Sequence, residues 1–81
     1  MDVSAGRYAK GAEERAARKA VSRIEKRLAR ITIEENAINA EILEHAQDYE
    51  RLAGLSARLT ALAAEKDDLE LEWLEASELL E

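Results

Sequence analysis

The stretch that decides the fold is Leu52–Leu80, LAGLSARLTALAAEKDDLELEWLEASELL. Its apolar residues alternate spacings of three and four, the pattern that places one stripe of a helix against a second helix in a coiled coil. One charged residue, Lys66, interrupts the stripe. The apolar positions are Leu52, Leu55, Leu59, Leu62, Leu69, Trp73, Ala76 and Leu80. A stripe of this length needs a partner helix to cover it.

The same chain supplies that partner upstream. Apolar residues between positions 21 and 42 repeat the same spacing, with Glu35 as the one charged intruder. The segment between the two stripes, HAQDYE at 45–50, is short and polar. We therefore predict an all-α fold, a two-helix antiparallel coiled-coil hairpin. Its predicted hydrophobic core is Val21, Ile24, Leu28, Ile31, Ile38, Ile42, Leu55, Leu59, Leu62, Leu69 and Trp73.

The ends of the two helices are predicted from capping residues. Asp48 suits the N-cap of the second helix, and His45 suits the carboxyl end of the first, where positive charge complements the helix dipole. Gly54 predicts fraying in the first turns of the second helix. The expected division is a flexible N-terminal linker over residues 1–12 and a hairpin over 13–81, made of helix 13–45, turn 46–49 and helix 50–80.

Charged residues at the helix contact give the expected register. With the turn centred between Asp48 and Tyr49, Arg27 lies beside Glu72, Glu41 lies beside Arg58, and Glu34 faces Glu65 with the same sign of charge. The core intruders Glu35 and Lys66 fall in adjacent layers of opposite helices. We expect them to form a register pair, because a polar contact in a coiled-coil core disfavours other registers.

Length and composition limit the class of protein. The chain has 81 residues, no Cys and a charged fraction of 37%, which allows one small domain and no disulfide framework. No apolar run approaches the roughly 20 residues of a membrane span, and no segment resembles a signal peptide. We expect a soluble cytoplasmic protein with no membrane contact.

Charge divides the chain into a basic front and an acidic back. Residues 1–30 hold nine bases and four acids, and residues 31–81 hold three bases and fourteen acids. An antiparallel hairpin places these opposite charges side by side, whereas parallel self-pairing places like charges together. We therefore expect an intramolecular hairpin and a monomer.

A dense row of bases lies in the first helix. We predict nucleic-acid contacts at Arg15, Arg18, Lys19, Arg23, Lys26 and Arg30. Arg27 is expected to be occupied by Glu72. The alternative interpretation is that these bases are solvated and partly neutralised by the acidic segment opposite.

Three stretches carry a resemblance to a known family: RAARKAVSRIEKRLARI from Arg15, AQDYERLAGLSARLTAL from Ala46 and EKDDLELEWLEA from Glu65. Together they resemble the C-terminal coiled-coil domain of ABC-F family ATPases of the actinobacterial, Uup-like type, over about residues 12–78. The sequence keeps Asp48-Tyr49 at the turn and Glu72-Trp73 near the end, but it lacks the proline that often follows the turn aspartate in that family.

The resemblance implies an accessory domain of a cytoplasmic ATPase that acts in translation. Its ATP-binding cassettes, with ATP and Mg²⁺, would lie outside this chain, since no Walker A, Walker B or signature sequence is present. The implied partners are those cassettes and nucleic acid or the ribosome. The alternative is a structural coiled-coil spacer, or a protein-interaction (dimerisation) module, without nucleic-acid binding.

An enzyme is not expected from these residues. The chain has no nucleophile beside a base, no phosphate-binding glycine loop and no paired Glu-x-x-His sequences. We therefore predict no catalytic residue, no metal site and no cofactor in this chain. Leu71 and Leu74 lie off the apolar stripe, and the sequence leaves open whether they dock a partner.

Overall fold

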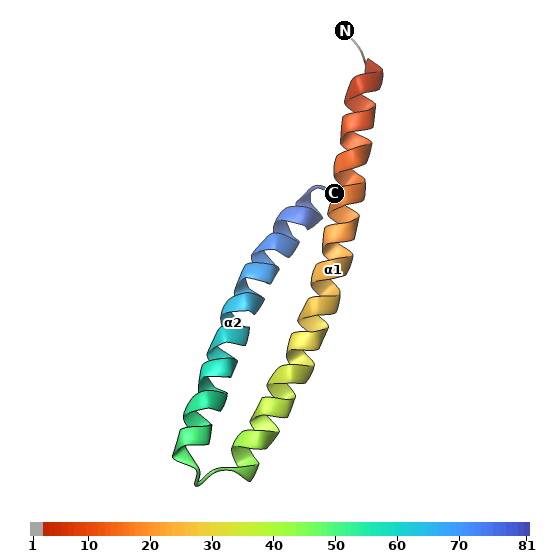
Figure 1. The fold of residues 1–81 in the computed structure, drawn as a ribbon. Helices are drawn as coiled ribbons and strands as arrows, with labels where there is room; N and C mark the ends of the chain where they lie inside the picture. Colours follow the sequence, from red (N-terminus) through yellow and green to blue (C-terminus); the bar gives the residue numbers. More distant parts are fainter. Residues whose placement is uncertain (1–2) are drawn as a thin grey trace.

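Two helices account for nearly all of the described chain. The computed structural model describes residues 3–81, and the side chains of 10–81. Helix α1, Val3–Glu44, and helix α2, Tyr49–Glu78, pack side by side in opposite directions (Figure 1). The Cα atoms span 70 × 15 × 14 Å, so the molecule is a rod. The predicted all-α helical hairpin is confirmed.

Helix α1 begins much earlier than expected. It starts at Val3, whereas the sequence predicted a linker over residues 1–12 and a helix from residue 13. The part of the predicted linker at residues 1–2 lies outside the described residues. Residues 1–12 contain two glycines, each of which costs a helix only about 1 kcal/mol. Extending an existing helix gains one hydrogen bond per residue, so this cost does not stop it.

The turn is close to its predicted position. Helix α1 ends at Glu44, and residues 45–47 form the turn. The Asp48 carboxylate caps α2, because its Oδ1 accepts a hydrogen bond from the Arg51 N–H at 3.2 Å. The Asp48 N–H donates to the His45 carbonyl at 2.9 Å. This confirms the N-cap, and α2 continues through Gly54 without the fraying predicted there.

The fully buried core is a narrow column. On α1 the buried residues recur every seven positions: Ala17, Ile24, Ile31 and Ile38. On α2 they are Leu55, Leu69 and Ala76, with the half-buried Leu62 completing the same spacing. The remaining predicted core residues are half-buried: Val21, Leu28, Ile42, Leu59 and Trp73. In a fold of only two helices, each helix fully buries one column of side chains against the other. The second apolar column of each helix lies at the border of the contact and stays partly exposed.

The packed cluster of the core lies away from the turn. Ile24, Ile31 and Leu69 form it. Ala20, Leu28, Leu62 and Trp73 pack around this cluster. Burying a side chain such as isoleucine stabilises a fold by about 1.5–3 kcal/mol, so these few residues supply much of the energy that holds α1 against α2.

Neither α1 nor α2 has a segment long and apolar enough to cross a bilayer, within residues 3–81.

Candidate nucleic-acid interface

Ion pairs line one border of the helix contact, which we call the charged edge: Arg23, Arg27, Glu34, Glu41, Arg58, Glu65 and Glu72. At the centre of the charged edge, Arg27 donates two hydrogen bonds to Glu65. The Arg27 Nε donates to Glu65 Oε2 at 2.6 Å, and Nη2 donates to Oε1 at 2.7 Å. The same guanidinium also reaches Glu34, with Nη1 3.4 Å from its Oε1.

These contacts change the proton affinity of both partners. The hydrogen bond from Arg27 holds the pKa of the Glu65 carboxyl below its usual value, against the opposing effect of desolvation. The hydrogen bond to Glu65 raises the pKa of Arg27. Because Arg27 lies between two carboxylates, it also neutralises the repulsion expected between Glu34 and Glu65.

The predicted pairing of Arg27 with Glu72 is wrong. Glu72 instead accepts a hydrogen bond from Arg23, with Nη2 and Oε1 2.5 Å apart. By turning toward Glu65, Arg27 contacts two acids, Glu65 and Glu34. Glu72 is therefore left to pair with Arg23, which lies one turn earlier on α1. The predicted Glu41–Arg58 pair is present at 4.0 Å, the limit for an ion pair.

The predicted register pair is also wrong. Glu35 and Lys66 are both half-buried, but no ion pair joins them among the side chains of residues 10–81. Both occupy the apolar column at the border of the contact, where long side chains reach water. Hydration there removes the need for a partner, so the register depends on the buried column and the charged edge.

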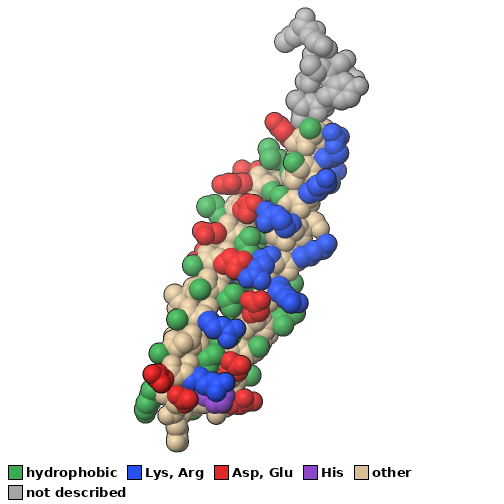
Figure 2. Space-filling model, in the orientation of Figure 1, with side chains coloured by type: hydrophobic (Ala, Val, Ile, Leu, Met, Phe, Trp, Pro, Cys, Tyr) green, Lys and Arg blue, Asp and Glu red, His purple; other side chains and the backbone are tan. Residues whose placement is uncertain are grey.

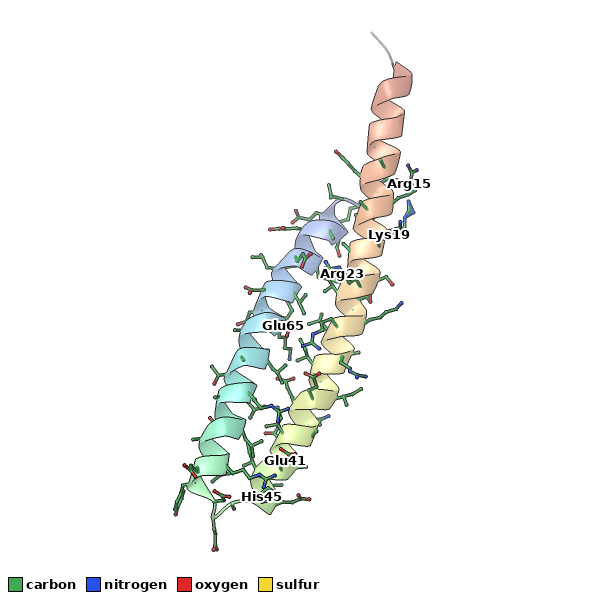
Figure 3. All side chains as sticks on the ribbon, in the orientation of Figure 1. Arg15, Lys19, Arg23, Glu41, His45 and Glu65 are labelled. Atoms are coloured by element: carbon green, nitrogen blue, oxygen red, sulfur yellow. The ribbon has the colours of Figure 1, made fainter. Side chains whose placement is uncertain are left out.

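Four bases remain on the outer side of α1, and we call them the basic face: Arg15, Lys19, Lys26 and Arg30. All four are exposed, and none has an ion partner among the described side chains. Figure 3 shows Arg15 and Lys19 projecting away from α2, whereas Arg23 and Glu65 lie between the helices. Of the other predicted contacts, Arg23 is bound to Glu72, and Arg18 pairs with Glu14 at 3.5 Å.

The basic face is a straight row. At 100° per residue, its four bases fall within about 60° of one another around α1, and no acid of residues 15–30 lies in that sector. At about 1.5 Å per residue, they extend over roughly 22 Å of the helix. Between them lie small residues, Ser22 and Ala29. The row is therefore open to a polyanion along its whole length.

The acids of α2 lie mainly on the other side of the rod. Figure 2 shows basic side chains along the outer side of α1, and acidic and hydrophobic ones along α2. The rod is about 15 Å thick. Because the screening length at physiological ionic strength is about 8 Å, the acids on the far side of α2 weaken the potential at the basic face only slightly.

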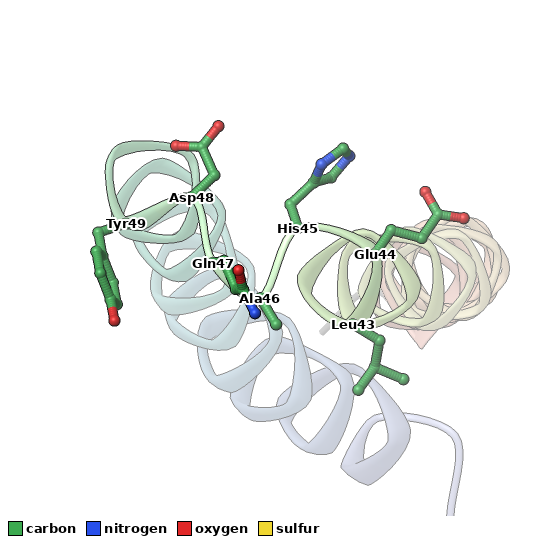
Figure 4. A pocket seen from close by; sticks show the side chains of 7 residues that line it. All are labelled: Leu43, Glu44, His45, Ala46, Gln47, Asp48 and Tyr49. Carbon is green, nitrogen blue, oxygen red and sulfur yellow. The ribbon is translucent and has the colours of Figure 1, made fainter.

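An open surface depression lies at the turn, with a volume of about 720 Å³. Its lining residues are spread over both sides of the turn: Leu43 and Tyr49 lie apart on different helices and point to one side, and His45 projects to the opposite side (Figure 4). These side chains do not converge on a common point. Within the described residues, no three side chains of His, Asp or Glu are grouped to hold a metal ion.

Two features of this surface were missed in the sequence. Ala17 is buried at 4% exposure, and its position seven residues before Ile24 was the available signal. The sequence contains no comparable indication of the Arg23–Glu72 pair. Ion pairs in a coiled coil are expected from the positions that directly flank the core, and Arg23 lies one position farther around the helix.

Comparison with known proteins adds no identity, because no family model, no curated protein and no solved structure matches this sequence.

Proposed function

We propose that this hairpin binds nucleic acid through the basic face of α1. The observation that carries the proposal is that Arg15, Lys19, Lys26 and Arg30 form an acid-free row without ion partners among the described side chains, although the chain as a whole has a net charge of −6. The chain has many carboxylates that could pair with bases. Among the described side chains, they pair with Arg23 and Arg27 at the helix contact, and not with the four bases of the basic face.

The proposed binding is to phosphates. Neighbouring bases in the row are about 6 to 10 Å apart along α1, a spacing compatible with successive phosphates of one strand. Lysine and arginine at this spacing supply charge and hydrogen-bond donors, but the row has no amide or aromatic side chain to read a base edge or stack on it. We therefore expect little preference for sequence.

The dependence of affinity on salt tests this proposal. If four phosphates are neutralised, log K for a short DNA duplex should fall with log[salt] at a slope of about −3.6. Fluorescence anisotropy of labelled duplex DNA and duplex RNA measures this slope. Lys19→Ala with Lys26→Ala should reduce it by half and weaken binding to both duplexes.

The matched control is Arg51→Ala with Arg58→Ala, which removes two positive charges from α2 and changes net charge equally. This control should keep the slope of the unchanged protein. An equal loss of binding in both double variants would show that net charge alone is responsible, and no binding at low salt would refute the proposal.

The wider biological setting follows from the resemblance of the three sequence stretches. We propose that the hairpin is the C-terminal accessory domain of a cytoplasmic ABC-F ATPase, and that ribosomal RNA is one candidate polyanion for the basic face. The sequence upstream in the same reading frame is the direct test. Two ATP-binding cassettes would support this assignment, and an unrelated upstream protein would refute it without affecting the binding measurement.

One observation favours the alternative function, a structural spacer or protein-interaction module. The rod is 70 Å long, and a buried column holds α2 against α1 from Ala17 to Ile38, which suits a spacer. A chain that folds normally and shows no salt-dependent binding to either duplex would favour this alternative.

A further inference from the structure

Two exposed leucines on α2 are surrounded by acids. Leu71 is 60% exposed and Leu74 is 54% exposed, and they lie three residues apart on one side of the helix. Asp67 and Glu78 occupy the same side, one on each side of the leucines along the axis. Asp68 and Glu75 flank them. We call these six residues the acidic leucine patch: Asp67, Asp68, Leu71, Leu74, Glu75 and Glu78.

The patch has the anatomy of a small docking site. Apolar side chains lie at its centre and charged ones at its rim, as in protein interfaces. Helix α1 also has two strongly exposed apolar residues, Ile33 and Leu43. Neither has an acid three or four residues before or after it. The acids therefore mark Leu71 and Leu74 as a surface for a positively charged partner.

The basic face has the complementary character and lies at the same level of the rod. The Arg23–Glu72 contact places the middle of the patch level with the middle of the basic face. The two surfaces are on the outer sides of α1 and α2 and face away from each other, so they cannot meet within one molecule. A second copy of the chain brings them together.

We propose that the acidic leucine patch of one copy docks on the basic face of a second copy. Leu71 and Leu74 contact the small Ser22 and Ala29 and the methylene stems of Lys19 and Lys26, while the rim acids pair with the lysine and arginine heads. When the two rods point in the same direction, α2 of one copy runs antiparallel to α1 of the next. Their helix dipoles then also attract.

This contact joins two different surfaces, so each added copy exposes both surfaces again. Such an interface gives open-ended growth and not a closed dimer. It is small, and we expect a dissociation constant on the order of 100 µM. At lower concentration the chain is monomeric. The proposal does not require nucleic-acid binding, but a bound polyanion would occupy the same bases and dissociate the copies.

Sedimentation of the full chain without nucleic acid tests the proposal. The weight-average mass should rise steadily with concentration at low salt, without a plateau at the mass of a dimer, and should return to the monomer at about 0.5 M salt. Leu71→Gln with Leu74→Gln should abolish the rise. The matched control, Ile33→Gln with Leu43→Gln, removes from α1 two apolar residues that are at least as exposed as the leucines, and it should keep the rise.

A complementation experiment identifies the two surfaces. Lys19→Glu with Lys26→Glu destroys the basic face and leaves the patch, and Leu71→Gln with Leu74→Gln destroys the patch and leaves the basic face. Each variant alone should remain monomeric, and an equimolar mixture should form one heterodimer and stop there. Circular dichroism confirms that each variant is helical.

Three outcomes would overturn the proposal: a monomer at every concentration of the unchanged chain, self-association of either of these two variants alone, or a monomeric mixture of the two. The nucleic-acid proposal is tested separately, since it would survive all three.

Discussion

The hairpin has two unequal halves. The open half comprises residues 15–34 of α1 and 62–78 of α2, and the turn half comprises residues 35–44 and 49–61. The open half holds the packed cluster around Ile31 and the three shortest contacts of the charged edge, at Arg23 and Arg27. The turn half holds Ile38 and Leu55, one ion pair at 4.0 Å and a glycine inside α2.

The difference follows from where the covalent connection lies. Near the turn, the two helices are held close by a few residues of chain, so the entropy lost on pairing them is small. At the open end the separation is limited only by side-chain contacts. The packed cluster and the tight ion pairs therefore lie where the backbone itself does not hold the helices together.

The largest expected effect comes from truncating the core of the open half. Ile31→Ala removes a fully buried side chain from the packed cluster and should destabilise the hairpin by about 3 kcal/mol. Ile38→Ala makes the same change at a residue of equal burial outside that cluster and should cost about 2 kcal/mol. Urea denaturation followed by circular dichroism measures both. A larger loss for Ile38→Ala would reverse the comparison.

A smaller effect is expected from repairing the turn half. A methyl group added at Gly54 meets no atom within 4 Å, and the residue lies inside α2. Gly54→Ala should therefore raise the free energy of unfolding by about 0.5–1 kcal/mol, through helix propensity alone. Thermal denaturation measures the gain, and Ala57→Gly, one turn later, serves as the control and should lower stability by a similar amount. No gain at Gly54 would mean that these turns of α2 are not helical.

The smallest effect concerns the charged edge at low pH. The pKa of Glu65 is lowered in the folded chain from its usual value of 4.5, so its pairing with Arg27 stabilises the fold fully above that pH. The stabilisation is lost as the pH falls below 4.5 and through the pKa of the folded state. Melting temperatures measured between neutral pH and about pH 3 should fall less steeply for Glu65→Gln than for the unchanged chain.

Glu75→Gln provides the control for that series, because Glu75 has no ion partner among the described side chains. It should reproduce the pH dependence of the unchanged chain. Equal slopes for all three proteins would show that the Arg27–Glu65 contact does not persist in solution.

The hairpin itself could be predicted because its two apolar stripes repeat at the same spacing on either side of a polar turn. The capping role of Asp48 was equally accessible, since it depends on three consecutive residues. The start of α1 was not, because a glycine-containing segment that is weakly helical alone is extended cheaply from a helix already formed. The ion pairs were predicted only in part, because long side chains such as Arg27 choose among several acids within reach.

The sequence predicted which helix carries the basic row of the candidate interface, but not which bases stay free of ion partners. The sequence identified a row of six bases, and folding removes Arg23, and weakly Arg18, by pairing them with acids. Which bases remain depends on the rotation of α1 against α2. That rotation is set by the burial of residues such as Ala17, which the apolar pattern underestimated because alanine is small.

The opposite charges on the two outer sides of the rod give the molecule an electric moment across its width, at right angles to its long axis. In the field of a polyanion, this moment exerts a torque that turns α1 toward the polyanion before the two touch. A molecule with a net charge of −6 is repelled as a whole. Preferred rotation during approach offsets part of that repulsion, so the angular arrangement of charge, more than its sum, governs how often an encounter is productive.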